Sequence, residues 1–150
     1  MKVIYMDNNA TTRTAPEVVE AMRPFFSTFY GNPSSMHFFG GQVAGNVQQA
    51  REQTAALIGA DPSEIVFTSC GTESDNAALW GTLNSYPPKK QLVTTRVEHP
   101  AVLNLAAYLS KKGYRVTLLP VDREGRLDLD QLAAAITEET ALVSIMWANN

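Results

Sequence analysis

The chain has 150 residues, of which 45% are hydrophobic and 18% charged, and 12 Lys and Arg against 15 Asp and Glu give a formal net charge of −3. This composition excludes an intrinsically disordered chain, and the longest nearly apolar run, residues 141–148, is too short to cross a membrane. The mild acidity argues against a nucleic-acid partner, which would need a broad basic face.

Cysteine and histidine are scarce in this sequence. One Cys cannot form a disulfide framework, and one Cys with two His is too few for the usual zinc sites, so no metal centre is expected. The first nine residues show no signal peptide. A reducing, cytoplasmic location is therefore expected.

Strands and helices are expected to alternate along the chain, beginning with its first part. Pro16 suits the first position of a helix, Pro24 would end that helix, and Gly59 suits the C-cap of the next one. The expected elements are a short strand over residues 3–6, a helix over residues 16–22, a loop over residues 29–35 and a helix over residues 42–58.

From Ile65 onward, apolar strands are expected to alternate with helices. The expected strands cover residues 65–67, 91–95, 114–119 and 141–147, and the expected helices cover residues 72–83, 100–112 and 129–136. Strands without strict polar alternation are typical of a parallel sheet that is covered on both faces. The predicted fold class is α/β, with a three-layer, mostly parallel sheet and helices on both faces.

Three polar segments follow predicted strands of this sheet. They are residues 69–74, residues 98–100 and residues 149–150. Because the carboxyl ends of parallel strands meet at one edge, where ligands of open α/β sheets bind, these segments are expected to converge. This expected convergence is the main indication of a functional site that can be drawn from the residues alone.

The turn Ser69-Cys70-Gly71-Thr72-Glu73-Ser74 is suited to binding a phosphate group. Gly71 permits a close backbone approach, the helix start offers free N–H groups, and Thr72 adds a hydroxyl. The alternative is that Ser69 or Thr72 only caps the helix. Cys70 could be a nucleophile, because a helix start lowers the pKa of a thiol, or it could simply be packed.

Two further candidates stand at the other strand ends. His99 could stack on a flat ligand ring or move protons, or it could be an N-cap before Pro100. Asn150 could hydrogen-bond a ring oxygen, or it could belong to an ordinary polar turn. The loop over residues 31–37, which contains Asn32, could contact substrate or be purely structural.

Taken together, these segments resemble the cysteine desulfurases of the NifS/IscS group, which are class V, fold-type I enzymes dependent on pyridoxal 5′-phosphate (PLP). The motifs occur in order along the whole chain, and the SCGTES and EHPAV forms are most similar to the NifS branch. They are YMDNNATT (5–12), GNPSSMH (31–37), FTSCGTESDN (67–76), VEHPAV (97–102) and MWANN (146–150).

The resemblance implies a role for each candidate residue. Gly71 and Thr72 would hold the PLP phosphate, and His99 would stack on the pyridine ring and assist proton transfer. Asn150 would hydrogen-bond the phenolic oxygen of PLP, and Asn32 would lie near the substrate carboxylate.

The resemblance also implies a reaction and a domain organisation. The family takes sulfur from L-cysteine, leaves L-alanine, and passes the sulfur as a persulfide to an iron–sulfur cluster scaffold or another acceptor. Its members are homodimers. Residues 1–15 would belong to a smaller domain, and residues 16–150 to the large PLP-binding domain, which would be incomplete here.

The chain also departs from the family pattern. The Schiff-base lysine, the carboxylate that pairs with the pyridine nitrogen and the persulfide cysteine of the family lie beyond residue 150. No lysine of this chain falls at a strand end beside the proposed phosphate turn. The chain alone is therefore expected to be inactive. The alternatives are a fragment of a selenocysteine lyase or of a class V aminotransferase, or a non-catalytic truncated binding module.

Overall fold

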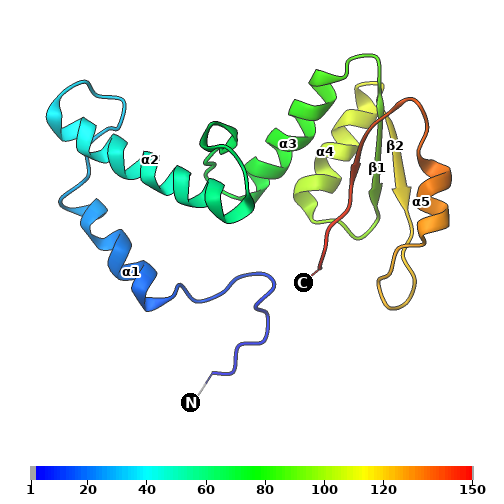
Figure 1. Ribbon diagram of the computed structural model, residues 1–150. Coiled ribbons are helices and arrows are strands. Elements are labelled where there is room, and N and C mark those ends of the chain that lie inside the picture. The colour runs from blue at the N-terminus through cyan, green and yellow to red at the C-terminus, as the bar shows by residue number, and fades with distance from the viewer. Residues whose placement is uncertain (1–2, 150) are drawn as a thin grey trace. The chain divides into compact units, whose positions relative to one another are not determined.

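The computed structural model describes residues 3–149, which form two compact units (Figure 1). Residues 11–67 form one unit, and residues 68–149 form the other together with residues 3–10. The two units are described separately below. The predicted division at residue 15 concerns the complete protein and stays a prediction.

The unit over residues 11–67 is helical. It contains α1 (Pro16–Met22), the 3-10 helix η1 (Arg23–Phe26), α2 (Phe38–Ile58) and the 3-10 helix η2 (Pro62–Glu64). Pro16 opens α1 as predicted, and Pro24 lies in the tighter turn that follows it. Gly59 ends α2 with a φ of 70°, which confirms the predicted left-handed C-cap.

Helix α2 begins four residues before the predicted start at Gln42. The Nδ1 atom of His37 accepts a hydrogen bond of 3.2 Å from the N–H of Gly40 and so caps the helix. A Cβ atom at Gly40 would come within 2.7 Å of the backbone oxygens of Asn32 and Ser35. The glycine thus lets the loop over residues 31–37 pack against the first turn of α2.

The unit over residues 68–149 contains a three-stranded parallel sheet (Figure 1). Its elements are α3 (Gly71–Ser85), β1 (Gln91–Thr95), α4 (Pro100–Lys111), β2 (Arg115–Leu119), α5 (Leu129–Ala135) and β3 (Thr140–Ser144). The strand order is β2-β1-β3, and Leu92 of the central strand lies opposite Val116 and Leu142. The predicted α/β class with a parallel sheet is confirmed.

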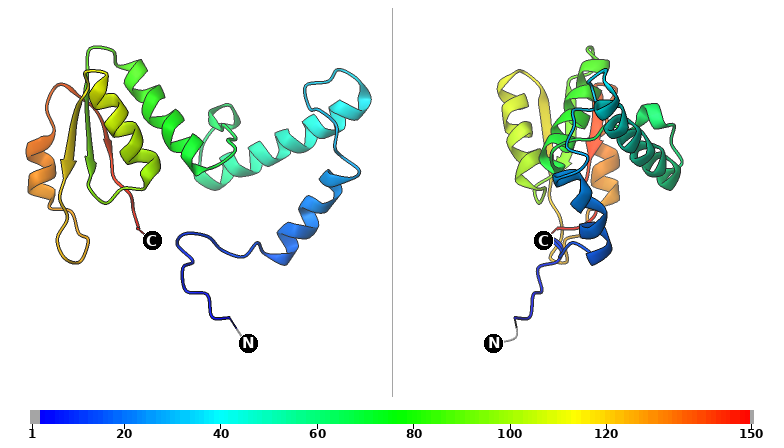
Figure 2. Two further views of the ribbon diagram at one scale, coloured as in Figure 1. Left: turned by 180° about the vertical axis from the view of Figure 1, so that it is seen from behind. Right: turned by 90° about the vertical axis from the view of Figure 1, so that its left-hand side faces the viewer.

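The order of the strands determines where the helices lie. The connection from β1 to β2 and the connection from β2 to β3 cross the sheet in opposite directions. Because parallel crossovers are right-handed, α4 and α5 cover opposite faces, as Figures 1 and 2 show. The sheet is therefore the middle of three layers.

The two faces of β1 are buried differently. On the side of α3 and α4, Leu92 packs in an apolar cluster with Leu79, Leu83, Val102, Leu105, Ala106 and Leu109. On the other side, the fully buried side chain of Gln91 donates to Thr117 and to the carbonyl of Ala135 and accepts from Thr137 and Thr140. These bonds join β1 to β2, α5 and β3 at the amino ends of the strands.

Two predicted strands are absent, because neither apolar run has a partner strand within residues 3–149. Residues 3–6 form no regular element, and Val3 and Met6 are more than four-fifths exposed. Residues 65–67 are also unpaired, and Val66 is 77% exposed. An extended segment without ladder hydrogen bonds gains little from its β propensity.

Two other strands are shorter than predicted, because backbone N–H groups bond elsewhere. The N–H of Tyr114 donates to Leu109 at the end of α4, so β2 begins at Arg115. The N–H of Met146 donates to the side chain of Glu98, and β3 ends at Ser144 and not at Trp147. The remaining predicted helices agree with α3, α4 and α5 within a few residues at each end.

Candidate functional site

Strands β1 and β3 are parallel neighbours in the sheet but are not consecutive in the chain. The connection leaving β1 leads to β2 on one side, whereas β3 pairs with β1 on the other side. In open α/β sheets the crevice beyond the carboxyl ends of two such strands is the usual ligand site. Here those ends lead into residues 96–99 and residues 145–149.

Helix α3 starts beside this edge with free backbone donors. Its N-cap is Cys70, and among the described residues no side chain caps the helix. A Cβ atom at Gly71 would meet no heavy atom within 4 Å, so a ligand can approach this backbone closely. Neither Ser69 nor Thr72 acts as the cap, so no hydroxyl occupies the N–H groups that the helix start offers to an anion.

Glu73 orders the turn that precedes α3. Its Oε2 atom accepts 2.7 Å hydrogen bonds from both the Oγ and the backbone N–H of Ser69. These bonds lower the pKa of Glu73, the hydroxyl contributing most, so the side chain stays a carboxylate at neutral pH. Ser74 and Thr68 add a hydroxyl pair at 2.6 Å.

His99 and the first turn of α3 line one small hollow of about 330 Å³, together with Cys70 and Asp75. His99 is also the N-cap of α4, because its Nδ1 atom accepts a hydrogen bond of 3.1 Å from the N–H of Ala101. An accepting Nδ1 places the ring proton of the neutral form on Nε2. His99 therefore both caps α4 and lies beside the first turn of α3.

Cys70 is exposed beside His99 in the same hollow. The backbone N–H of Glu73 and the hydroxyl of Ser69 lower the pKa of its thiol. The thiol is therefore more acidic than an unperturbed cysteine. The interpretation of Cys70 as a simply packed residue does not fit this exposed position.

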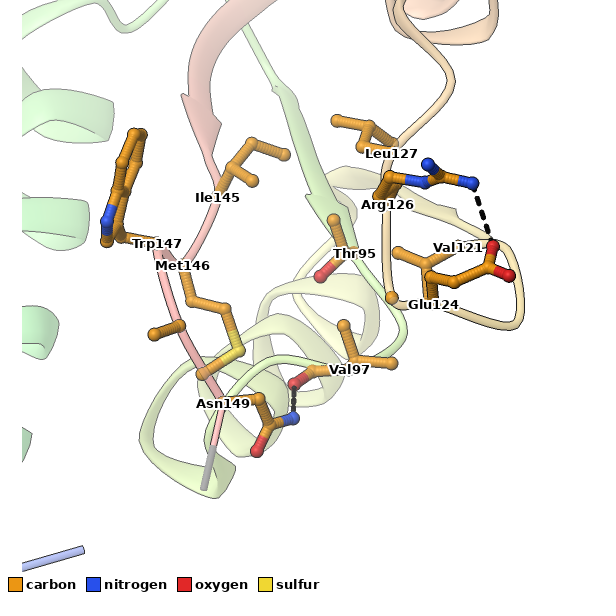
Figure 3. A pocket seen from close by; sticks show the side chains of 12 residues that line it. Thr95, Val97, Val121, Glu124, Arg126, Leu127, Ile145, Met146, Trp147 and Asn149 are labelled. Carbon is orange, nitrogen blue, oxygen red and sulfur yellow. Dashed lines mark hydrogen bonds and ion pairs between the residues drawn. The ribbon is translucent and has the colours of Figure 1, made fainter. Parts of the chain in front are cut away.

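Glu98 belongs to a polar segment that the sequence placed at this edge, but sequence reasoning gave it no role. Its Oε1 atom accepts hydrogen bonds from the Oγ1 of Thr95 (2.8 Å) and from the N–H of Met146 (2.9 Å), and the residue is only 6% exposed. Next to it, the Nδ2 of Asn149 donates to the carbonyl of Val97 at 2.6 Å (Figure 3). The sequence signal that could have pointed to Glu98 is its place between a predicted strand and His99.

A wider hollow of about 580 Å³ opens beside these cross-links. Figure 3 shows side chains from the ends of β1 and β3 and from the turn over residues 121–127 around it. Arg126 lies there, but its guanidinium pairs with Asp122 and Glu124 at 2.9 and 2.8 Å. Its charge is therefore partly neutralised by its own turn.

The other two predicted site residues, Asn32 and Asn150, lie outside the described part of this unit. Asn32 lies in the unit over residues 11–67, where its Oδ1 accepts from the N–H of Ser34 at 2.9 Å in a local turn. Asn150 lies outside the described residues. The roles expected for both therefore stay predictions.

The described lysines occupy the opposite edge of the sheet. Lys89 and Lys90 directly precede β1, and Lys111 and Lys112 end α4, whereas His99 follows β1 and begins α4. Five strand residues span about 16 Å at roughly 3.3 Å each. Within residues 3–149, no lysine follows a strand end at the edge that His99 and the α3 turn share.

The described residues contain neither a metal-binding cluster nor a membrane-spanning helix. Residues 3–149 hold no group of three or more His, Cys, Asp or Glu side chains that could bind a metal ion. In the same range, no helix combines the length and the hydrophobicity needed to span a bilayer.

Comparison with known proteins identifies the family. Residues 4–150 match the aminotransferase class-V family, and the chain belongs to it. Over all 150 residues the chain is 61% identical to a cysteine desulfurase of Trichormus azollae. It spans 38% of the length of that relative.

Two solved structures are similar to the chain. A NIFS-like protein has a TM-score of 0.88 and 45% identity, with 95% of this chain and 39% of that protein covered. SspA in complex with cysteine has a TM-score of 0.83 and 37% identity, with 91% and 40% covered. The similarity agrees with the α/β fold and with the resemblance found in the sequence motifs.

Proposed function

We propose that the chain is the amino-terminal part of a PLP-dependent cysteine desulfurase, which converts L-cysteine to L-alanine and passes on a persulfide sulfur. The observation that carries this proposal is the hollow in which the uncapped start of α3 and His99 lie side by side. The class V family, the desulfurase relative and the structure of SspA with cysteine support it.

The residues of the hollow fit PLP by their chemistry. The phosphate would bind the N–H groups at Gly71 and Thr72 and the Thr72 hydroxyl, where the open space at Gly71 admits it. When bound, PLP withdraws electrons from the bonds to the substrate α-carbon. His99 would stack on the ring, and Nε2 would hold or move a proton while Ala101 keeps Nδ1 oriented.

The remaining roles concern the complete protein. We assign Asn150 to the phenolic oxygen of PLP and Asn32 to the neighbourhood of the substrate carboxylate. Residues 1–15 would contribute to a smaller domain and residues 16–150 to the large one. The complete enzyme would be a cytoplasmic homodimer that passes sulfur to an iron–sulfur scaffold or another acceptor.

The isolated chain is expected to lack desulfurase activity. A Schiff-base lysine must reach the cofactor carbonyl, and the lysines of residues 3–149 stand at the far edge of the sheet. In the test, the purified chain is incubated with PLP and reduced with borohydride, and the mass of the intact protein is then measured by mass spectrometry. An unmodified mass is expected, and a stoichiometric adduct on one lysine would contradict the proposal.

The proposed reaction is tested in a hybrid enzyme. The 150 residues replace the matching segment of the Trichormus azollae cysteine desulfurase, whose remaining chain follows unchanged. We expect PLP binding and alanine formation from cysteine, with a loss of about 10²-fold or more in kcat on His99→Ala. Glu138→Ala, at an exposed position on the same chain, serves as the control.

The alternatives give different products in this assay. Alanine formed from selenocysteine and not from cysteine would indicate a selenocysteine lyase. Amino-group transfer to a keto acid without sulfur release would indicate an aminotransferase. A hybrid that folds but takes up no PLP would support a non-catalytic binding module.

A further inference from the structure

Glu98 carries a buried carboxylate that the proposed roles leave unused. It is 6% exposed, and none of the ion pairs within residues 3–149 includes it. Burying a carboxylate without a cation is costly unless hydrogen bonds satisfy it. Its Oε1 atom accepts two, from the Thr95 hydroxyl and from the Met146 N–H.

These two bonds join segments that are distant in the sequence. Thr95 ends β1, whereas Met146 follows β3 and is 48 residues from Glu98. The bond from Asn149 to the carbonyl of Val97 ties the same two segments together a second time (Figure 3). The carboxylate is therefore the buried member of a double cross-link at the carboxyl edge of the sheet.

The cross-linked segments are the ones that carry the proposed cofactor contacts. His99 follows Glu98 directly, and Asn150 follows Asn149 in the sequence. We propose that Glu98 is a positioning residue, which holds the segment after β3, residues 145–149, in place beside the ring-stacking His99. This inference rests on the proposed function and assigns Glu98 no contact with substrate or cofactor.

The geometry specifies what a substitute side chain must supply. One oxygen atom accepts both hydrogen bonds. Gln offers such an oxygen at nearly the same length, whereas Met has nearly the same length and only a weakly accepting sulfur. Glu98→Met should therefore release the segment after β3, and Glu98→Gln should keep it in place.

The test compares three variants of the hybrid enzyme after loading with PLP. A displacement of about 1 Å at a catalytic group costs up to about 10²-fold in rate, so Glu98→Met should lower kcat about 10- to 100-fold. It should also shift the visible absorption band of the bound cofactor at full cofactor stoichiometry. Glu98→Gln should restore the band and most of kcat, and Glu138→Met, at an exposed position, should change neither.

The outcomes separate this inference from the proposed function. A fully loaded Glu98→Met enzyme with an unchanged band and kcat overturns the positioning role, as does equal impairment of the Met and Gln variants. If the parent hybrid binds PLP but forms no alanine, the proposed reaction fails while the absorption bands still test Glu98. If the parent hybrid takes up no PLP, both the proposed function and the positioning role of Glu98 are refuted.

Discussion

The adjacent glycines of α2 should respond in opposite ways to the same substitution. Both lie near the start of the helix, where Ala is intrinsically favoured over Gly by up to about 1 kcal/mol. At Gly41 a Cβ atom would meet no heavy atom within 4 Å. Gly41→Ala should therefore leave the free energy of unfolding unchanged or raise it by up to about 1 kcal/mol.

At Gly40 the same methyl group has no room. It would lie 2.7 Å from the Cβ of Ser35 and equally close to two backbone oxygens, whereas carbon contacts are optimal at about 3.5–4.0 Å. The loop over residues 31–37 would have to move, and overpacking of this kind costs about 1–3 kcal/mol. We expect Gly40→Ala to be less stable than Gly41→Ala by about 1–3 kcal/mol.

Urea unfolding of the two variants in the hybrid enzyme, followed by far-UV circular dichroism, measures this difference. Hydrogen exchange at the amides of residues 31–37 then shows whether the loop has moved. Equal stability of the two variants would refute the reasoning that backbone contact with the loop explains Gly40.

Three further predictions concern residues of the other unit. Thr94→Val should raise the unfolding free energy by about 1 kcal/mol, because the buried Thr94 Oγ1 has no hydrogen-bond partner among residues 3–149. Thermal unfolding measures this change, and a loss of stability would contradict the prediction. Gln91→Leu should lower the unfolding free energy by about 2–3 kcal/mol, because Thr117, Thr137 and Thr140 lose their hydrogen bonds to this side chain. Urea titrations measure the change, and an unchanged midpoint would show that these hydrogen bonds do not stabilise the fold. The lowered pKa of the Cys70 thiol means that more thiolate is present at a given pH, so the midpoint of its alkylation rate should lie below that of an unperturbed cysteine. Ser69→Ala should move this midpoint upward, and a midpoint unaffected by it would exclude the hydroxyl as a cause.

The local sequence pattern was sufficient to predict β1 but not to exclude a strand over residues 65–67. Residues 91–95 match β1 at both ends, because Leu92 and Val93 form a short apolar run between Lys90 and Arg96. Residues 65–67 are entirely apolar but have no partner strand among the described residues, and pairing is not encoded locally. Composition alone could not separate these two cases.

The candidate site was predicted only in part by topology. His99 follows β1 as expected, and it lines one hollow with the turn at Gly71. The strand expected before that turn is absent, and the turn opens α3, whose Leu79 and Leu83 pack against α4. The start of α2 was missed because Gly40 and Gly41 disfavour a helix, and the local sequence does not show that the loop over residues 31–37 packs on Gly40. Glu98 was given no role because its partner Met146 is 48 residues away.

The position of β1 in the sequence has a consequence for how the protein is made. The central strand leaves the ribosome before both of its neighbours, since β2 and β3 follow it by at least 20 residues. Its Gln91 side chain obtains all of its partners only after Thr140 has been synthesised. The growing chain therefore holds a strand with two unpaired sides during translation, a period in which a chaperone would have an extended peptide to bind.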